Sequence, residues 1–355
     1  MEPWPARAGD SCAPNGRCPA AAEVDGPHGP YTPELRCVEG TCAASPREWC
    51  NDRDDTGEGE VDEGCALEVA EVPLESIRVP IRLVERGEVL GLLDGIDETR
   101  DRTLHVLDAN LTETSAFPIP DHIEQLVAAR DGFVGLGLRI TEPAALEVVR
   151  WGLDGTVIST LSLGPALDGS LLAQGDDPIR LVTPEGEVHA FDATSGEALG
   201  VATVGERQLV GAVGPSVVLC DASLTLWVSP LLEVREVPGG CTLLASPGGE
   251  LSLWGFSSDI LRDTEDGGRQ TFAAPSTTAP FQLLLTATEE HADLWVRSGA
   301  TYLRVTRVGI DGSEAVRVIG SSGETVLDAA AVGDLSVALV TGTAGTRLLV
   351  VGPAR

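Results

Sequence analysis

One pattern recurs from about residue 66 to the end of the chain: an apolar strand, a turn rich in Asp, Gly or Asn, and a second strand. Its copies are HVLDANLTETSAFPI (105–119), VRWGLDGTVISTLSL (149–163), VHAFDATSGEALGVATV (188–204) and RVGIDGSEAVRVIG (307–320). The turn residues Asp108, Asp154 and Asp192 lie 46 and 38 residues apart. A second apolar series runs in parallel, as LVAA (126–129), LLAQ (171–174), LVGA (209–212), LLAS (243–246) and LLTA (284–287). Short strands with a period near 40 are typical of a β-propeller.

The repeat count predicts an all-β fold of about seven blades. The chain ends at Arg355, after what would be the third strand of the last blade. An unpaired edge would remain there, and residues 68–80 have the strand character needed to close the ring. The repeat is weakest in blades four and five, where the stretch SSDILRDTEDGGRQ (257–270) matches it poorly.

Cysteines set the N-terminal part of the chain apart. Segment 1–49 is short of apolar residues, so the sequence predicts a small disulfide-rich module there, typical of an oxidising compartment. Its cysteines, whose connectivity the sequence leaves open, are Cys12, Cys18, Cys37 and Cys42. A cytosolic zinc site is the alternative, but it would need C-x-x-C pairs or nearby histidines, and His28 is the closest one.

Two further cysteine pairs are expected from their places in the chain. Cys50 and Cys65 are expected to pair with each other and to close a loop of about 15 residues. A disulfide that closes a loop of this length stabilises the folded state by roughly 3 kcal/mol. Cys220 and Cys241 fall in adjacent predicted blades and are expected to join them. The alternative for this second pair is two buried free thiols.

Segment 50–65, CNDRDDTGEGEVDEGC, has the oxygen donors of a cation site. Read from Asp52, donors stand at positions 1, 3, 5, 9 and 12, with Gly57 at position 6, as in a calcium loop. A second, more compact register begins at Asp54. The predicted ligands are Asp52, Asp54, Asp55, Thr56, Glu58, Glu60, Asp62 and Glu63. Hard oxygen donors favour Ca²⁺ over zinc or copper; the alternative is a solvated acidic linker.

The same segment resembles a known family. The matching residues are Asn51, Asp54, Asp55, Gly59, Val61, Asp62, Glu63, Gly64 and the bracketing cysteines. They are similar to the MopE-type metal-binding motif repeat, roughly CNGxDDDCDGxVDEGC, which is common in surface and secreted proteins. The resemblance implies metal binding without naming the metal. Gly57 and Glu58 replace the family's internal cysteine and aspartate, which leaves Cys50–Cys65 as the implied bond.

Charge and hydropathy exclude several functions. The formal net charge is −31 and the chain has no lysine, so nucleic acid and anionic lipid are disfavoured partners. No apolar run approaches the length of a transmembrane helix. The start, MEPWPARAGD, lacks the basic and apolar regions of a signal peptide, so either the signal peptide has been removed from this chain or there is none, and the cysteines favour removal. Because the cysteines indicate an oxidising compartment, the expected location is extracellular, periplasmic or at the cell surface. The protein is expected to be a monomer.

No catalytic set is evident in the predicted inner strands, which are mostly aliphatic and small. The histidines His105, His122, His189 and His291 are scattered singly, and each is interpreted as a strand or loop residue. Tryptophans Trp151, Trp227, Trp254 and Trp295 are interpreted as packing between blades. The stretch VHAFDATSGEAL resembles one repeat of quinone-dependent dehydrogenase propellers, but it lacks their tryptophan and indicates only a blade turn.

The sequence therefore predicts three parts: a disulfide module (1–49), an acidic metal-binding motif (50–65) and a propeller (66–355). The leading hypothesis is a secreted or surface binding protein, not an enzyme, with structural calcium and a propeller that holds a protein or glycan partner. One alternative is a propeller lyase, hydrolase or lactonase with its site at the channel mouth. The other is a structural coat or adhesion protein.

Overall fold

The protein is described here from a computed structural model. The residues that it describes are 24–26, 29–31, 35–38, 41–44, 67–74, 80–95, 102–140, 144–164, 167, 170–176, 178–205, 209–213, 216–221, 223–245, 252–256, 259–264, 268–273, 282–288, 290–298, 302–320, 324–342 and 345–353. The chain divides into two compact units, Met1–Cys65 and Ala66–Arg355, and each is presented by itself.

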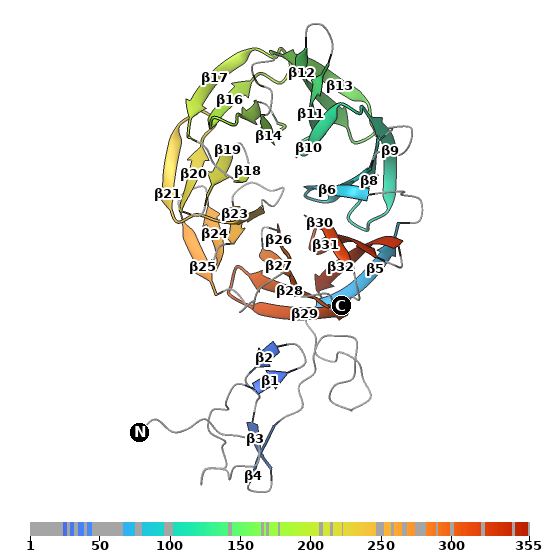
Figure 1. Cartoon of the computed structure of the whole chain (residues 1–355), viewed down its shortest axis with the longest axis vertical. Helices are drawn as coiled ribbons and strands as arrows, with labels where there is room; N and C mark the ends of the chain where they lie inside the picture. The colour runs from blue at the N-terminus through green and yellow to red at the C-terminus, as the bar shows by residue number, and fades with distance from the viewer. Residues whose placement is uncertain are drawn as a thin grey trace. The chain divides into compact units, whose positions relative to one another are not determined.

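The larger unit is a ring of seven four-stranded antiparallel sheets (Figure 1). The innermost strands of blades 1 to 7 are β6 (Pro80–Arg86), β10 (Ile123–Ala129), β14 (Leu171–Gln174), β18 (Leu209–Val213), β22 (Leu243–Ala245), β26 (Gln282–Ala287) and β30 (Thr325–Val332). The second strands are β7 (Val89–Asp94), β11 (Gly132–Arg139), β15 (Ile179–Val182), β19 (Ser216–Cys220), β23 (Ser252–Phe256), β27 (His291–Ser298) and β31 (Leu335–Gly342).

The outer half of each blade completes the sheet. The third strands are β8 (Arg102–Leu107), β12 (Ala145–Gly152), β16 (Glu187–Phe191), β20 (Leu224–Val228), β24 (Ile260–Thr264), β28 (Tyr302–Gly309) and β32 (Gly345–Pro353). The outermost strands are β9 (Glu113–Ile119), β13 (Val157–Leu163), β17 (Ala198–Thr203), β21 (Val234–Pro238), β25 (Arg269–Phe272), β29 (Glu314–Gly320) and β5 (Leu67–Pro73). The poorly matching stretch near residue 260 does form a blade, because β24 and β25 pair there.

Strand β5 closes the ring, as the sequence predicted. It pairs antiparallel with β32 from Leu67↔Pro353 to Pro73↔Arg347, so the last sheet has the order β30-β31-β32-β5. Pairing of the first propeller strand with the last one removes the open edge that three strands would leave. The seven-bladed, strand-closed propeller is therefore confirmed.

Apolar side chains seal most of the junctions between blades. Six clusters of buried residues each join two neighbouring blades, and they lie at the junctions 1/2, 2/3, 3/4, 5/6, 6/7 and 7/1. Trp151, Trp254 and Trp295 belong to these clusters, as expected of tryptophans that pack between blades. Next to junction 4/5 the described cluster is small, with Val218 and Trp227 of blade 4.

Polar side chains link the innermost strands of neighbouring blades. The amide of Gln125 donates to the carbonyl of Ser170 and accepts from the N–H of Leu172, both at 2.8 Å. Gln282 donates in the same way to the carbonyl of Val326 at 2.8 Å. These hydrogen bonds join β10 to β14 and β26 to β30.

Two carboxyl groups make the corresponding link at the ring-closing junction between blades 7 and 1. Asp328 on β30 accepts the N–H of Leu83 on β6 at 2.8 Å. In return, Glu85 on β6 accepts the N–H of Ala331 on β30. Burial raises the pKa of both carboxyl groups, that of Glu85 to about 8. This junction is thus closed by two side chains that resist ionisation.

The smaller unit contains two hairpins among its described residues. They are β1 (Val24–Gly26) with β2 (Gly29–Tyr31), and β3 (Leu35–Val38) with β4 (Thr41–Ala44). The backbone register of the second hairpin places Cys37 opposite Cys42. In the part of the chain that the structure describes, no helix is long and apolar enough to cross a membrane.

Candidate functional site

The predicted metal-binding residues lie outside the described part of the chain. They are Asp52, Asp54, Asp55, Thr56, Glu58, Glu60, Asp62 and Glu63. The same holds for Cys12, Cys18, Cys50 and Cys65. Among the described residues, no group of three or more His, Cys, Asp or Glu side chains is placed to hold a metal ion. The calcium site therefore stays a prediction of the sequence.

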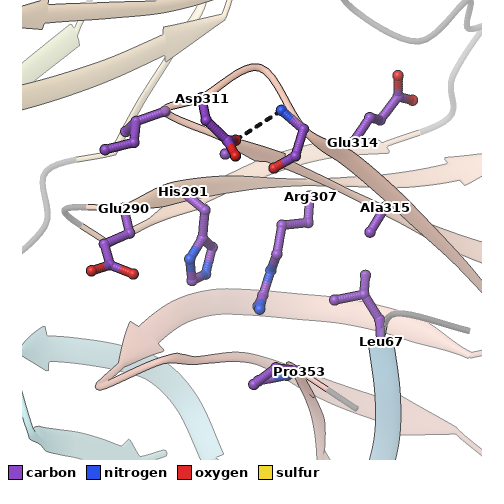
Figure 2. A pocket seen from close by; sticks show the side chains of 11 residues that line it. Leu67, Glu290, His291, Arg307, Asp311, Glu314, Ala315 and Pro353 are labelled. Atoms are coloured by element: carbon purple, nitrogen blue, oxygen red, sulfur yellow. Dashed lines mark hydrogen bonds between the residues drawn. The ribbon is translucent and has the colours of Figure 1, made fainter.

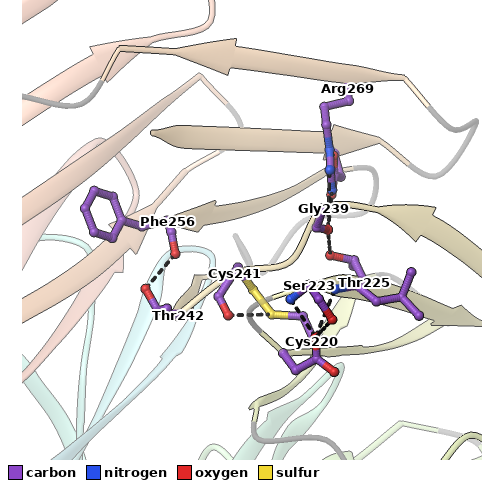
Figure 3. Close-up of a disulfide and its surroundings, with 11 residues drawn as sticks. Cys220, Ser223, Thr225, Gly239, Cys241, Thr242, Phe256 and Arg269 are labelled. Atoms are coloured by element: carbon purple, nitrogen blue, oxygen red, sulfur yellow. Dashed lines mark hydrogen bonds and ion pairs between the residues drawn. A yellow bond between two sulfur atoms is a disulfide. The ribbon is translucent and has the colours of Figure 1, made fainter. Parts of the chain in front are cut away.

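Cys220 and Cys241 are joined by a disulfide bond, with 5.9 Å between their Cα atoms (Figure 3). Cys220 ends β19 in blade 4, and Cys241 lies in the connection from blade 4 to blade 5. Both side chains are buried, and the N–H of Cys241 donates to the carbonyl of Asp221 at 2.7 Å. The bond therefore ties blade 4 to the start of blade 5, where the described apolar cluster is small.

The turn aspartates of the repeat shape the turns between third and fourth strands. Asp108 and Asp192 each accept two backbone N–H groups of their own turn, and Asp154 accepts the N–H and hydroxyl of Thr156. Such hydrogen bonds lower the pKa of Asp154 and Asp192, and those from Ser313 lower the pKa of Asp311. The carboxylates of Asp154, Asp192 and Asp311 therefore stay ionised over the whole physiological pH range.

Those turns all lie on one face of the ring. Because consecutive strands are antiparallel, the turns from first to second and from third to fourth strands emerge at the same end of every blade. We call this end the turn face. Its described exposed acidic residues are Glu88, Glu113, Asp131, Asp154, Glu197, Glu233, Glu290, Asp311, Glu314 and Asp334. Among the described turn residues, Arg130 is the one exposed base, so this face is strongly anionic.

A pocket of about 570 Å³ opens on the turn face at blades 6 and 7 (Figure 2). Its polar lining comes from the turns and strand ends of blade 6. These residues are Glu290, His291, Arg307, Asp311, Ser313 and Glu314. Leu67 and Pro353, the first residue of β5 and the last of β32, line it from blade 7. The ring-closing strand thus forms part of the pocket wall.

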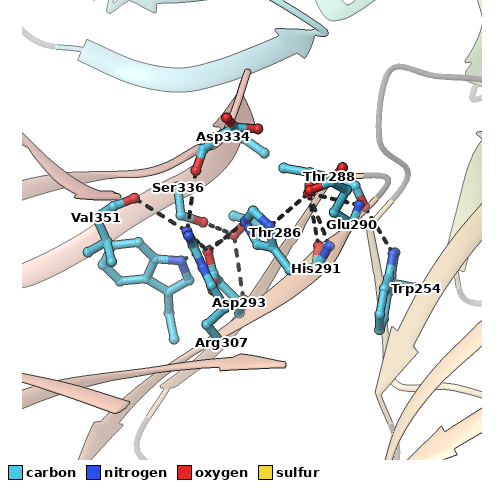
Figure 4. A network of polar contacts seen from close by, with 12 residues as sticks. Trp254, Thr286, Thr288, Glu290, His291, Asp293, Arg307, Asp334, Ser336 and Val351 are labelled. Atoms are coloured by element: carbon cyan, nitrogen blue, oxygen red, sulfur yellow. Dashed lines mark hydrogen bonds and ion pairs between the residues drawn. The ribbon is translucent and has the colours of Figure 1, made fainter. Parts of the chain in front are cut away.

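A buried ion pair lies behind this pocket (Figure 4). Arg307 donates two hydrogen bonds to the fully buried Asp293, from Nε at 2.9 Å and from Nη2 at 2.8 Å. The same guanidinium reaches the carbonyls of Asp334 and Val351 in blade 7, each at 3.5 Å. Thr286 of blade 6 also contacts Ser336 of blade 7. The network therefore joins two blades and neutralises the charge of Arg307.

His291 stands between this network and the pocket. Its Nδ1 lies 3.0 Å from the hydroxyl of Thr288. Its Nε2 is buried without a hydrogen-bond partner, and the nearest carboxylate oxygen, on Asp293, is 3.6 Å away. Burial is the main cause that lowers the pKa of His291. The charge of Arg307 also lowers it, whereas the nearby carboxylates, Asp293 foremost, act in the opposite direction. The imidazole is therefore neutral at neutral pH.

Sequence reasoning missed the partners of the propeller histidines. Each lies near a carboxylate: His105 near Glu113 at 2.8 Å, His122 near Glu147 at 2.6 Å, and His189 near Glu187 at 3.1 Å. These partners stand 2 to 25 residues away along the chain. A search for residues clustered in the sequence does not find these histidine–carboxylate pairs. They could have been suggested only once the strand pairs, and the side chains that share a face of each sheet, were known.

Comparisons with solved structures agree with the architecture. The structure of U3-55K is 10% identical, with a TM-score of 0.53, over 81% of this chain and 98% of that chain. The WD40 repeats of RRP9 are 11% identical, with a TM-score of 0.51, over 81% and 100%. The Neurospora crassa Pan2 WD40 domain is 9% identical, with a TM-score of 0.50, over 79% and 90%. The chain is a seven-bladed β-propeller. At these identities the likeness shows the fold alone; no family model and no curated protein matches the sequence.

Proposed function

We propose that this protein is a secreted or cell-surface binding protein, not an enzyme, whose propeller holds a protein or glycan partner. The observation that carries the proposal is the pocket on the turn face, which is lined by exposed carboxylates that no described group neutralises by an ion pair. By contrast, the described inner-strand side chains Gln125, Gln282 and Asp328 are engaged in hydrogen bonds between blades. Polar groups are therefore available at the rim of the ring.

The acidic motif at 50–65 adds a structural role for calcium. Its donor spacing is that of a loop in which carboxylate and hydroxyl oxygens surround Ca²⁺. Carboxylates about 4 Å apart repel each other by roughly 4 kcal/mol at an effective dielectric of 20. A bound divalent cation would relieve this repulsion.

Binding of the partner is tested with the full chain on arrays of glycans and of basic, neutral and acidic peptides. We expect saturable binding to at least one class, reduced when the pocket rim is neutralised by Glu290→Gln with Glu314→Gln. Asp121→Asn with Glu185→Gln is the matched control, because both residues are exposed at the opposite end of the blades. Absence of binding to every array would refute the proposal.

Calcium binding is tested by thermal unfolding of the full chain in millimolar Ca²⁺ and in chelator. Extracellular calcium sites typically have dissociation constants of about 10⁻⁴ to 10⁻³ M, so millimolar Ca²⁺ should raise Tm. Asp54→Ala with Asp62→Ala should abolish that rise, whereas the control Asp121→Asn with Glu185→Gln should keep it. Equal Tm values in calcium and chelator would leave the solvated acidic linker as the better interpretation.

A propeller enzyme is the second candidate, and Glu85 with Asp328 is the observation that favours it. The raised pKa of Glu85 keeps a proton available near neutral pH, as a general acid requires. An enzyme of this kind should turn over lactone, ester or uronide substrates and lose that activity in Glu85→Gln. If the protein binds its partner but turns over none of these substrates, this candidate is rejected.

A further inference from the structure

We propose that the pocket at His291 receives an arginine or lysine side chain of a basic polypeptide partner. This inference rests on the proposed binding function and narrows the partner from a protein or glycan to a polypeptide with exposed cationic side chains. Two features of the pocket support it: its charge and its apolar lining.

The charge of the pocket is negative. Glu290, Asp311 and Glu314 contribute three carboxylates, and all three residues are exposed to solvent. Among the described lining residues Arg307 is the only cationic side chain, and its two hydrogen bonds to Asp293 neutralise it. An anionic ligand would meet three like charges, whereas a cation would gain from each of them.

The charge at Asp311 is fixed by the fold. The side chain and the backbone N–H of Ser313 hydrogen-bond its carboxylate and hold its pKa below the usual value. The carboxylate is also held in one orientation at the edge of the pocket (Figure 2). A cation at this edge would therefore meet a preorganised partner, and little side-chain entropy would be lost on binding.

The remaining lining suits the aliphatic part of the same side chains. Leu67, Ile310, Ala315 and Pro353 contribute apolar surface next to the carboxylates. Arginine and lysine bury their methylene stems along apolar surface while their charged ends stay with polar groups. A pocket of about 570 Å³ admits such a side chain together with part of its backbone. A neutral glycan would use the apolar surface poorly and would leave the carboxylates without a counter-charge.

His291 lines the pocket without adding a positive charge, because burial lowers its pKa. Only 8% of the residue is exposed, and its Nε2 lacks a hydrogen-bond partner. The hydroxyl of Thr288 already accepts the N–H groups of Glu290 and His291, so it is best placed to donate its own proton to Nδ1. That arrangement places a proton on Nε2, which is buried and lies 3.6 Å from a carboxylate oxygen of Asp293, so the imidazole stays uncharged.

The rest of the turn face would act at longer range. Its exposed acids surround the ring and would draw a basic partner toward the pocket before contact is made. This attraction is screened by salt, because the Debye length is about 8 Å at physiological ionic strength. Contacts inside the pocket are screened less, so salt separates the two contributions.

The test uses the full chain and a fluorescent dodecapeptide of glycine and serine that carries three arginines. Its twin carries three citrullines, which keep the shape and remove the charge. Fluorescence anisotropy is measured at low and at physiological salt. We expect the citrulline peptide to bind at least 10-fold more weakly. Glu290→Gln with Glu314→Gln should weaken the arginine peptide at least 10-fold, and the control Asp121→Asn with Glu185→Gln less than 2-fold.

Three results would overturn the inference: no binding of the arginine peptide, equal binding of the citrulline peptide, or equal loss in the two double variants. The third result would assign the binding to diffuse charge, or to the acidic segment 50–65. Both substituted rim residues are exposed, so the variant is expected to fold. A glycan or other peptide whose binding survives the rim substitutions would overturn this inference alone. Failure of every ligand class would overturn the binding function itself.

Discussion

The carboxyl group of Glu85 offers a direct test of how the ring is closed. It lies on β6, accepts the N–H of Ala331 on β30, and stands near the carboxyl group of Asp328. Its pKa is raised from 4.5 to about 8, chiefly by burial; the Ala331 hydrogen bond opposes this rise, and the neighbouring Asp328 adds to it. Replacement by glutamine keeps the acceptor oxygen and removes the ionisable group, so Glu85→Gln isolates the effect of charge.

The sign of the effect follows from linkage. Below about pH 4.5 the carboxyl group is protonated in both the folded and the unfolded chain and contributes no pH dependence. Between pH 4.5 and about 8 the unfolded chain ionises it while the folded chain does not, so the wild type loses stability as pH rises. The loss is at most about 1.4 kcal/mol per pH unit. Since Glu85 is partly exposed, solvent screening reduces this loss, and we expect about 1–2 kcal/mol between pH 5 and pH 7.

Thermal unfolding across this pH range provides the measurement. Glu85→Gln and wild type should have similar Tm values at pH 4.5. At pH 8 the Tm of the variant should be several degrees above that of the wild type, because each kcal/mol of stability shifts Tm by about 2 °C in a domain of this size. Glu88→Gln, an exposed neighbour in the following turn, is the matched control and should track the wild type throughout. Parallel curves for Glu85→Gln and wild type from pH 5 to pH 8 would refute the reasoning.

Two further substitutions test other junctions of the ring. Replacing Cys220 and Cys241 by alanine opens a link between residues 21 apart, and we expect a loss of roughly 3 kcal/mol in urea unfolding; an unchanged midpoint would contradict that role. Asp293→Asn leaves the Arg307 guanidinium buried without its counter-charge and should cost about 3–5 kcal/mol. The exposed Asp311→Asn should cost under about 1 kcal/mol in the same experiment, and equal losses would count against a buried ion pair that stabilises two blades.

The sequence was sufficient for the ring and its closing strand. A period near 40 identifies the blades, and the missing fourth strand of the last blade directs attention to residues 68–80, which overlap β5. The turn aspartates were also visible, because Asp and Gly favour the tight turns that they form. In the turn at Gly155, φ is +82° and an added Cβ would meet the Phe117 ring at 2.5 Å. Such local rules do not depend on distant contacts.

The pocket and the buried pairs could not be found in this way. Leu67 and Pro353 are separated by nearly the whole propeller and meet only because β5 pairs with β32. Asp293 and Arg307 are directly opposite each other across β27 and β28, which requires the register of that pair to be known. Repeats predict which strands neighbour each other, but not which side chains face the same space at a particular junction.

The position of the disulfide links the stability of the ring to the compartment in which it folds. A closed ring opens at its weakest junction, and six junctions are sealed by apolar clusters that include both neighbouring blades. Described contacts at junction 4/5 are more polar: Arg269 of blade 5 pairs with Asp263 and donates to carbonyls of the blade 4 end at Pro238 and Gly239. A covalent bond adds most where packing contributes least. Since such a bond persists in oxidising compartments, its place at this junction supports the proposal that the protein works outside the cytoplasm.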